Sequence, residues 1–374
     1  MPDVPPITLP NDLIPSDGRF GSGPSKVRGD AVASLGRDAA TYLGTSHRRT
    51  RVRDVVAEIR AGLTRLYTLP AGYEVLLGVG GCTLFWEAAA LSLIDRRSEH
   101  LVFGEFSSKF RTVVAQAPYL DPPVVIESPP GSAPDADPSA DVDTFALTHN
   151  ETSTGVMAPV RRPRDDGSLV VVDGTSAAGA TLLDPDTFDA YYFSPQKGFG
   201  SEGGLWIALC SPAAVTRIEA IAASDRWIPP MSSLLVALDN SRKNQTYNTP
   251  ALTTLYLLAD QISWLERQGG LEWAAARSER SSSMIYDWAE SSAIASPFVS
   301  DARHRSTTVA TIDLVDNVPA ATVTGVLRNH GIIDIGGYRK LGRNQLRIAT
   351  FPNVDPEDVA TLIGAIDYVV ARLE

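Results

Sequence analysis

The feature that most constrains this fold is a series of short apolar runs without polar alternation. They occupy residues 73–81, 100–103, 124–127, 143–148, 169–173, 190–194 and 204–210. A strand with one face in water alternates apolar and polar side chains, whereas a strand covered on both faces does not. The runs therefore predict an α/β fold with a mostly parallel central sheet and helices on both of its faces.

Helical patterns lie between several of these runs. Residues 51–69 carry apolar side chains at steps of three and four, the period of an amphipathic helix. Residues 83–94 are apolar nearly all round, as expected of a buried helix, and 105–117 is also helical. Residues 129–141 are rich in Pro, Ser, Asp and Gly and indicate a surface loop.

The pattern changes after Pro250, where strands and helices become less dense. We expect helices at 251–268, 270–290, 319–329 and from Pro356, and strands at 307–315, 332–335 and 344–351. A chain of 374 residues has the length for two domains. The prediction is a large domain at 16–255, a smaller C-terminal α+β domain at 256–374, and an extended N-terminal segment at 1–15.

Charge and composition exclude several classes of partner. The net charge is −11, from 33 Lys and Arg against 44 Asp and Glu, which disfavours nucleic acid. No stretch approaches the roughly 20 apolar residues of a membrane-spanning helix, and the N-terminus lacks the pattern of a signal peptide. Two distant cysteines form no disulfide framework. We expect a cytoplasmic protein, without a metal site because the five histidines show no metal-ligand spacing.

A glycine-rich turn follows the first apolar run. Gly78, Gly80 and Gly81 would let backbone N–H groups approach an anion at the N-terminus of a helix. An ordinary strand-to-helix turn explains these glycines equally well. The dinucleotide pattern needs a glycine at position 83, where the chain has Thr83, and this argues against a nicotinamide dehydrogenase.

Asp173 ends one predicted buried strand, and Lys197 follows the next one. Asp173 lies at a carboxyl end, where open α/β sheets bind ligands, although a turn cap is an equal alternative. Lys197 lies among small residues, where partial burial would lower the pKa of its amine and suit a Schiff base, although a lone loop lysine is usually solvated. Pyridoxal 5'-phosphate needs both a lysine and a carboxylate at its ring nitrogen. The two residues are 24 positions apart with one strand between them, so they can meet both ends of one ring.

Motifs along nearly the whole chain resemble the fold-type I, class V aminotransferases, and within them the phosphoserine aminotransferase family. They are GSGPSKV (21–27), TSHR (45–48), HNETSTG (149–155), VVDGTS (171–176), SPQKGFG (194–200), NQTYNTP (244–250) and YRKLGRNQLRIA (338–349). The resemblance implies a homodimer with shared active sites. It also implies transfer of an amino group from L-glutamate to 3-phosphohydroxypyruvate, which gives O-phospho-L-serine and 2-oxoglutarate in serine biosynthesis.

The resemblance also implies roles for single residues. Lys197 would form the Schiff base, Asp173 would face the pyridine nitrogen, and Phe106 would stack on the ring where tryptophan is familiar. Thr152 would face the phenolic oxygen. The phosphate would be bound by Gly81, Cys82 and Gln196, together with Asn248 and Thr249 of the neighbouring subunit. The substrate would be bound by Arg347 and Ser22 at its α-carboxylate, and by His47 and Arg48 of the other subunit at its distal anion.

Two departures from the family pattern concern anion binding. Cys82 stands where better-known members carry arginine, and Tyr338 where they carry histidine. The segment holding Arg339, Lys340 and Arg343 is slightly longer than usual, and one of these side chains could compensate.

Other functions remain as alternatives. An alanine–glyoxylate aminotransferase would share the cofactor. A cysteine desulfurase needs a thiol on a mobile loop, whereas Cys82 begins a helix and Cys210 ends a strand. A non-catalytic ligand-binding protein would not need both Asp173 and Lys197. Some relatives also act on a related phosphorylated keto acid in vitamin B6 (pyridoxine) synthesis, an activity that the sequence leaves open.

Overall fold

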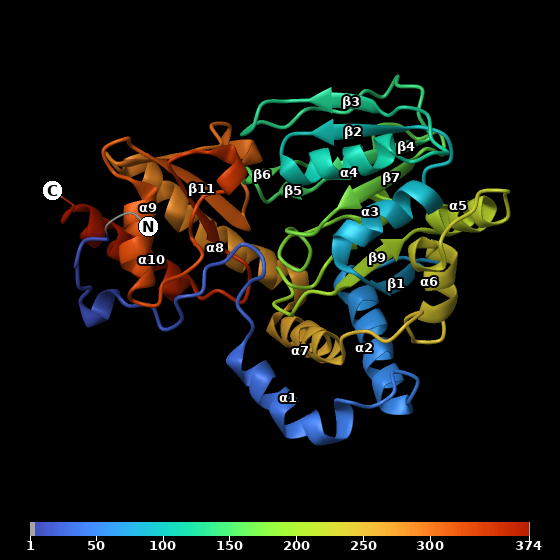
Figure 1. Ribbon diagram of the computed structural model, residues 1–374, viewed down its shortest axis with the longest axis horizontal. Helices are drawn as coiled ribbons and strands as arrows, with labels where there is room; N and C mark the ends of the chain where they lie inside the picture. The colour runs from blue at the N-terminus through green and yellow to red at the C-terminus, as the bar shows by residue number, and fades with distance from the viewer. Residues whose placement is uncertain (1–3, 374) are drawn as a thin grey trace.

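The computed structural model describes residues 4–373, so residues 1–3 of the predicted N-terminal segment and Glu374 lie outside the described part. Figure 1 shows a larger body built around the central sheet beside a smaller body at the C-terminal end of the chain. The N-terminal segment runs along the smaller body, and its Leu9 and Phe20 are buried in that body's core. The division into residues 16–255 and 256–374 stays a prediction.

The central sheet has seven strands in the order β1-β9-β8-β7-β4-β2-β3. Its strands are β1 (Glu74–Val79), β2 (Ser98–Val102), β3 (Val124–Glu127), β4 (Thr144–Thr148), β7 (Leu169–Asp173), β8 (Ala190–Phe193) and β9 (Leu205–Cys210). From β8 to β3 all neighbours are parallel, whereas β9 runs antiparallel to both β1 and β8. This confirms the predicted mostly parallel sheet.

Helices cover both faces of this sheet, which explains the unbroken apolar runs. They are α2 (Thr50–Leu66), α3 (Gly81–Ser92), α4 (Glu105–Ala115), α5 (Pro212–Ala222), α6 (Leu234–Ser241) and α7 (Leu252–Gln268). The helix α1 (Gly29–Tyr42) packs against α7 instead of the sheet. In β7, Val170 and Val172 join the core beneath α2 and α7, whereas Leu169 and Val171 join the core beneath α3 and α4. Successive strand side chains point to opposite faces, so apolar residues are needed at every position.

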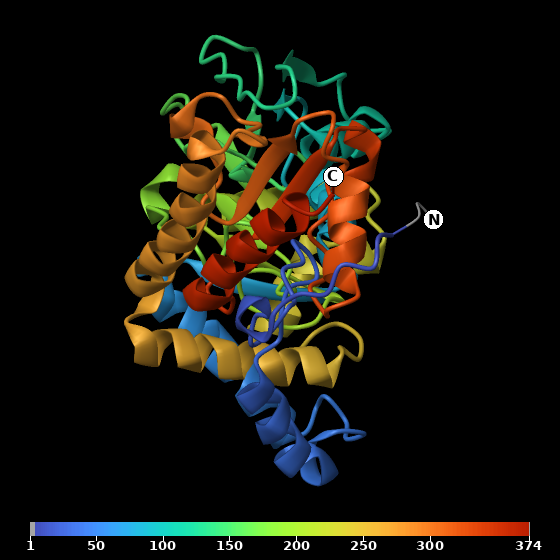
Figure 2. The ribbon, with the colours of Figure 1, turned by 90° about the vertical axis from the view of Figure 1, so that its left-hand side faces the viewer.

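The smaller body contains a three-stranded antiparallel sheet. Its strands are β10 (Ala295–Pro297), β11 (Val309–Leu314) and β12 (Gln345–Ala349), and its helices are α8 (Gly270–Ser291), α9 (Ala320–Arg328) and α10 (Pro356–Val370). Figure 2 looks onto this body, with α10 in front of the sheet and α1 projecting below. A short hairpin, β5 (Asn150–Glu151) with β6 (Val156–Met157), lies at the junction with the central sheet.

The remaining elements are single turns of 3-10 helix: η1 (Asn11–Leu13), η2 (Pro185–Thr187), η3 (Pro230–Ser232), η4 (Ala302–His304) and η5 (Arg339–Leu341). Among residues 4–373, no helix has the length and apolar character required to cross a membrane.

The predicted strand at 332–335 is wrong. Ile332 and Ile335 are buried, as the apolar pattern suggests, but Ile333 forms only an isolated bridge with Arg19. Asp334 has φ of 63°, in the left-handed region, which turns the chain away from an extended path. The segment is a turn in which Ile332 and Ile335 are buried and Asp334 is exposed, and it joins the N-terminal part of the chain to the small body.

Candidate active site

A cavity of about 420 Å³ lies at the carboxyl ends of the parallel strands, and its lining contains most of the predicted site residues. These are Ser22, Gly81, Cys82, Phe106, Thr152, Asp173, Gln196, Lys197 and Arg347. The strands β4, β7 and β8 are parallel and paired in register, with Thr148 opposite Asp173 and Asp173 opposite Tyr192. Because these strands end at the same edge of the sheet, residues distant in sequence meet there.

Lys197 is held in the loop after β8 with only 7% of its surface exposed. Its Nζ donates a hydrogen bond to Thr152 Oγ1 at 2.8 Å and lies 5.2 Å from the centre of the Phe106 ring. A Cβ atom at Gly23 would come within 2.8 Å of Lys197 Cε, and the φ of 145° at this position also favours glycine. Burial lowers the pKa of Lys197 to about 8, although the negative charge of Asp173 opposes that shift. The amine is therefore available to react with a carbonyl group near neutral pH.

The carboxylate of Asp173 is oriented by two donors. Trp86 Nε1 donates to Oδ2 at 3.3 Å, and the backbone N–H of Thr175 donates to Oδ1 at 2.9 Å. Asp173 is 5% exposed and lines the same cavity as Lys197. A carboxylate fixed in this way can hold a protonated ring nitrogen, and this fits the predicted cofactor.

The glycine turn before α3 forms an anion-binding end of the cavity. Gly80 and Gly81 have φ of 102° and 69°, in the left-handed region that glycine adopts without strain. The turn presents the N-terminus of α3, which carries a partial positive charge, to the cavity. Cys82 Sγ, at the start of the same helix, accepts a hydrogen bond from Thr175 Oγ1 at 3.1 Å. The chemistry of this turn suits a phosphate group.

Arg347 reaches the cavity from β12 of the small sheet. One of its terminal nitrogens donates to the backbone carbonyl of Thr152 at 3.2 Å, and its guanidinium lies 5.3 Å from the centre of the Tyr338 ring. Its Nε and the hydroxyl of Ser22 are buried without a hydrogen-bond partner among residues 4–373. A buried donor without an acceptor destabilises the folded protein. This part of the cavity is therefore suited to an acceptor such as a carboxylate.

The four residues predicted to act in the neighbouring subunit do not belong to this cavity in their own chain. The described residues that line the cavity do not include His47, Arg48, Asn248 or Thr249. His47 Nδ1 and Thr249 Oγ1 are 3.2 Å apart, so the structure brings two of the four together across 202 positions. Arg48, Asn248 and Thr249 are exposed. Burial and the nearby charge of Arg48 lower the pKa of His47.

None of the three basic residues that could compensate for Cys82 is among the described residues that line the cavity. Lys340 pairs with Glu105 at 2.5 Å, and Arg343 pairs with Asp313 at 2.5 Å. Arg339 is exposed. Tyr338, which replaces the familiar histidine, lines the cavity and faces Phe106 with ring centres 6.1 Å apart.

Sequence reasoning missed three residues that shape the site. Trp86 was expected only in the core, but its indole N–H orients Asp173. Ser176 accepts the hydroxyl hydrogen bond of Thr152 at 2.8 Å, and Glu151 accepts hydrogen bonds from the start of α4. Glu151 and Ser176 lie within the motifs HNETSTG (149–155) and VVDGTS (171–176), and Trp86 lies one helical turn after the glycine turn. These positions are the only signal that could have identified them.

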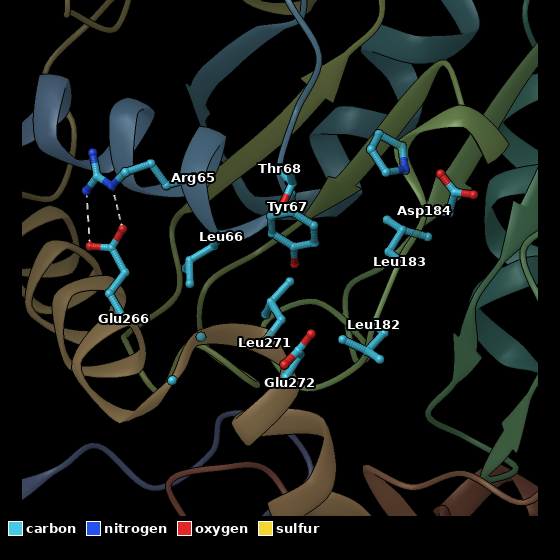
Figure 3. A pocket seen from close by; sticks show the side chains of 13 residues that line it. Arg65, Leu66, Tyr67, Thr68, Leu182, Leu183, Asp184, Glu266, Leu271 and Glu272 are labelled. Atoms are coloured by element: carbon cyan, nitrogen blue, oxygen red, sulfur yellow. Dashed lines mark hydrogen bonds and ion pairs between the residues drawn. The ribbon is translucent and has the colours of Figure 1, made fainter.

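A larger cavity of about 630 Å³ lies between the end of α2, the turn from α7 to α8, and residues 182–185 (Figure 3). On one wall, Arg65 and Glu266 already bind each other at 2.7 Å. Leu182 and Leu271 contribute apolar surface. The pairing of a buried amine with an oriented carboxylate belongs to the smaller cavity.

Known proteins resemble this chain over nearly its whole length. Residues 136–340 match the family Aminotransferase class-V. A putative phosphoserine aminotransferase of Mycobacterium leprae is 55% identical over 371 residues, which are 99% of each chain. A phosphoserine aminotransferase of Rhodococcus jostii is 53% identical over 98% of each chain. The crystal structure of a phosphoserine aminotransferase from Cytophaga hutchinsonii has a TM-score of 0.85 and 26% identity, covering 94% of this chain and 99% of that one.

These matches confirm the predicted fold and the predicted cofactor. The pairing of Asp173 with Lys197 across one cavity is what a pyridoxal phosphate-dependent transaminase requires. The chain belongs to the class-V aminotransferases, a pyridoxal phosphate-dependent family, and the relatives described above that are more than 50% identical to it bear the name phosphoserine aminotransferase.

Proposed function

We propose that this enzyme transfers the amino group of L-glutamate to 3-phosphohydroxypyruvate, giving O-phospho-L-serine and 2-oxoglutarate. The observation that carries the proposal is one cavity in which Lys197, Asp173 and Arg347 converge beside the glycine turn of α3. Relatives that match almost the whole chain bear the name phosphoserine aminotransferase, which supports this substrate over glyoxylate.

The cavity offers a partner for each part of the cofactor. Lys197 would hold its aldehyde carbon, Asp173 its ring nitrogen, Phe106 its ring face and Thr152 its phenolic oxygen. Gly81, Cys82 and Gln196 would surround the phosphate at the start of α3. Pyridoxal phosphate bound here supplies an electron sink for the negative charge that develops at the substrate's Cα.

Lys197 is the residue that we propose moves the proton. Its pKa of about 8 leaves a useful fraction of the amine unprotonated, so it can take a proton from Cα of glutamate. The hydroxyl of Thr152 accepts a hydrogen bond from Nζ and thereby fixes the direction of the amine. The same lysine returns the proton when the amino group passes to the keto acid.

Substrate binding would use both ends of the dicarboxylate. Arg347 offers its free Nε to the α-carboxylate, with the hydroxyl of Ser22 nearby. We propose that the enzyme is a homodimer in which His47 and Arg48 of the other subunit bind the distal carboxylate or phosphate. Asn248 and Thr249 would complete the phosphate site of the cofactor from the same side, which is consistent with the contact between Thr249 and His47.

The test is a comparison of amino acceptors with glutamate as the donor. We expect purified enzyme with pyridoxal phosphate to convert 3-phosphohydroxypyruvate at least about tenfold more efficiently than glyoxylate or pyruvate, by the ratio of kcat/KM. A preference for glyoxylate would reject this substrate in favour of an alanine–glyoxylate aminotransferase. Conversion of cysteine to alanine with formation of a persulfide on the enzyme would instead indicate a desulfurase.

A further inference from the structure

The N-terminus of α4, which carries Phe106, is capped by residues from outside the helix. Its N-cap residue, Gly104, has no side chain to offer. Glu151 Oε2 accepts hydrogen bonds from the backbone N–H groups of Phe106 at 3.1 Å and Ser107 at 2.9 Å. Ser153 Oγ accepts the N–H of Glu105 at 3.0 Å. The first three N–H groups of the helix are therefore satisfied by the 151–153 loop, which takes the place of an ordinary N-cap.

The surroundings of the Glu151 carboxyl group consist of donors. Besides the two backbone groups of α4, it accepts the hydroxyl of Ser107 at 3.0 Å, and the N–H and hydroxyl of Ser153 at 3.2 and 2.7 Å. Glu151 is fully buried, and burial raises its pKa while these hydrogen bonds oppose the shift. A carboxylate accepts hydrogen bonds at both oxygens, whereas a protonated acid would bring a hydrogen that needs an acceptor. The donor set and the positive end of α4 suit the charged form.

Gly104 leaves the space through which this carboxyl group enters. A Cβ atom at position 104 would lie 2.4 Å from Glu151 Cγ and 2.6 Å from Ser153 Oγ. Any side chain there would displace the cap. The absence of an ordinary N-cap residue and the presence of the buried glutamate are thus parts of one arrangement.

Glu151 also adjoins the residue that contacts the lysine. Thr152 Oγ1 accepts the hydrogen bond of Lys197 Nζ at 2.8 Å, and the Thr152 carbonyl accepts that of Arg347 at 3.2 Å. Phe106, whose backbone is bound to the Glu151 carboxylate, lies on another side of the same Nζ atom. One carboxylate therefore ties the aromatic ring on α4 to the loop that contacts both Lys197 and Arg347.

We propose that Glu151 is a positioning residue of the active site, which fixes the distance between Phe106 and Thr152 around Lys197. The inference rests on the proposed cofactor site, because the residues that Glu151 positions are those around Lys197. It assigns no contact between Glu151 and the substrate. Misplacement of a reacting group by about 1 Å can cost on the order of 10²-fold in rate. The cap is thus expected to influence catalysis as well as helix stability.

The test replaces the carboxylate by an amide of the same shape. In the variant Glu151→Gln, the amide NH₂ group replaces one of the two accepting oxygens. It faces donors either at α4 or at Ser153, so the hydrogen bonds to one of these two partners are lost. We expect amide hydrogen exchange of Phe106 and Ser107 to quicken at least about tenfold, because their acceptor is weakened. We also expect the visible circular dichroism of bound pyridoxal phosphate to change, and the single-turnover reaction with glutamate to slow about 10- to 100-fold.

The matched control is Glu99→Gln, which makes the same change at a buried glutamate of β2 that accepts the N–H of Asp137. It should leave the exchange at α4, the dichroism and the glutamate reaction as in the wild type. If Glu151→Gln quickens exchange at α4 but leaves the dichroism and the rate within twofold of wild type, Glu151 serves only the helix and the proposal is wrong.

A second variant covers the case in which Glu151→Gln does not fold. Ser153→Ala keeps the carboxylate but removes its shortest hydrogen bond. It should give changes of the same kind and smaller size, and unchanged dichroism and rate would overturn the proposal. The readouts involve glutamate and the cofactor alone, so failure of 3-phosphohydroxypyruvate as an acceptor would reject the proposed substrate without affecting this inference.

Discussion

Lys197 donates a hydrogen bond to Thr152 across 45 positions of sequence, and this contact begins a directed chain of hydroxyl groups. Thr152 donates in turn to Ser176 Oγ at 2.8 Å, and Ser176 donates to the backbone carbonyl of Asn150 at 2.8 Å. Asn150 Nδ2 also donates to Ser176 Oγ, so this oxygen accepts two hydrogen bonds, one from Asn150 and one from Thr152. Because the hydroxyl hydrogen of Thr152 points to Ser176, a lone pair of Thr152 Oγ1 is left to accept the hydrogen bond from the Lys197 amine.

Replacing Lys197 by alanine should remove both proton transfer and covalent attachment of the cofactor. We expect kcat to fall by about 10²- to 10⁴-fold, since no other amine lines the cavity among the described residues. Absorbance spectroscopy and borohydride reduction would follow the attachment. The exposed Lys243 provides the control, because Lys243→Ala should behave as wild type. A variant Lys197→Ala that still forms a reducible bond with pyridoxal phosphate would refute the assignment.

The variant Asp173→Asn should keep the shape of the site and lose its negative charge. The Trp86 and Thr175 donors contact different carboxylate oxygens, and an amide offers only one acceptor. We expect kcat to drop about 10²-fold or more, because the cofactor ring nitrogen loses its counter-charge. Trp86→Phe removes a single hydrogen bond and should cost only about fivefold. Steady-state kinetics of both variants would rank them, and equal losses would contradict the charge argument.

The rate at which cofactor-free enzyme recaptures pyridoxal phosphate should depend on pH through Lys197. Burial lowers the pKa of this amine from 10.5 to about 8, so about a tenth of it is neutral at pH 7. Only the neutral amine attacks a carbonyl, and the rate should therefore rise with pH and level off above about 8. Stopped-flow absorbance between pH 6 and about 10 would record the curve. A plateau reached only near the ordinary lysine pKa would show that burial does not lower it.

Mixing two inactive variants should test the proposed sharing of active sites. In a dimer of one Lys197→Ala chain and one Arg48→Ala chain, one site holds both defects and the other holds neither. Random assortment of subunits would restore up to about a quarter of the wild-type activity. The measurement is the phosphohydroxypyruvate assay after joint refolding, with each variant alone as a control. Absence of any recovery, with mixed dimers demonstrated by mass, would contradict the contribution of Arg48 from the partner.

Replacing Arg347 by lysine tests whether Arg347 binds the α-carboxylate of the substrate. Arg347→Lys keeps the positive charge but loses the planar group that binds a carboxylate through two nitrogens. KM for glutamate should rise about 10-fold or more, with a smaller effect on absorbance of the bound cofactor. An unchanged KM would place the α-carboxylate elsewhere in the cavity.

The amino-acid sequence alone was enough to predict the central sheet, because a strand that is buried on both faces has an unbroken run of apolar residues. It also predicts the glycine turn, Asp173 and Lys197 as parts of the site, because the turn follows β1, Asp173 ends β7 and Lys197 lies in the loop after β8. The helix α1 escaped prediction because only Ala31 and Tyr42 of it are buried, which leaves little apolar periodicity. The segment 332–335 was wrongly predicted as a strand, because Ile332 and Ile335 are buried although the chain turns there.

The side chains that meet around Lys197 could not be predicted from the sequence, because tertiary packing brings them together. Phe106, Glu151 and Arg347 come from α4, from the β5 hairpin and from the small sheet, and no local period relates them. Trp86 follows an apolar helical pattern that predicts a core residue, yet its N–H is aimed at Asp173. Periodicity reports which face of an element is buried, whereas hydrogen-bond partners depend on how distant elements pack. The sequence therefore predicts Asp173 and Lys197 as site residues from their local context, whereas the positions of their neighbours depend on tertiary packing.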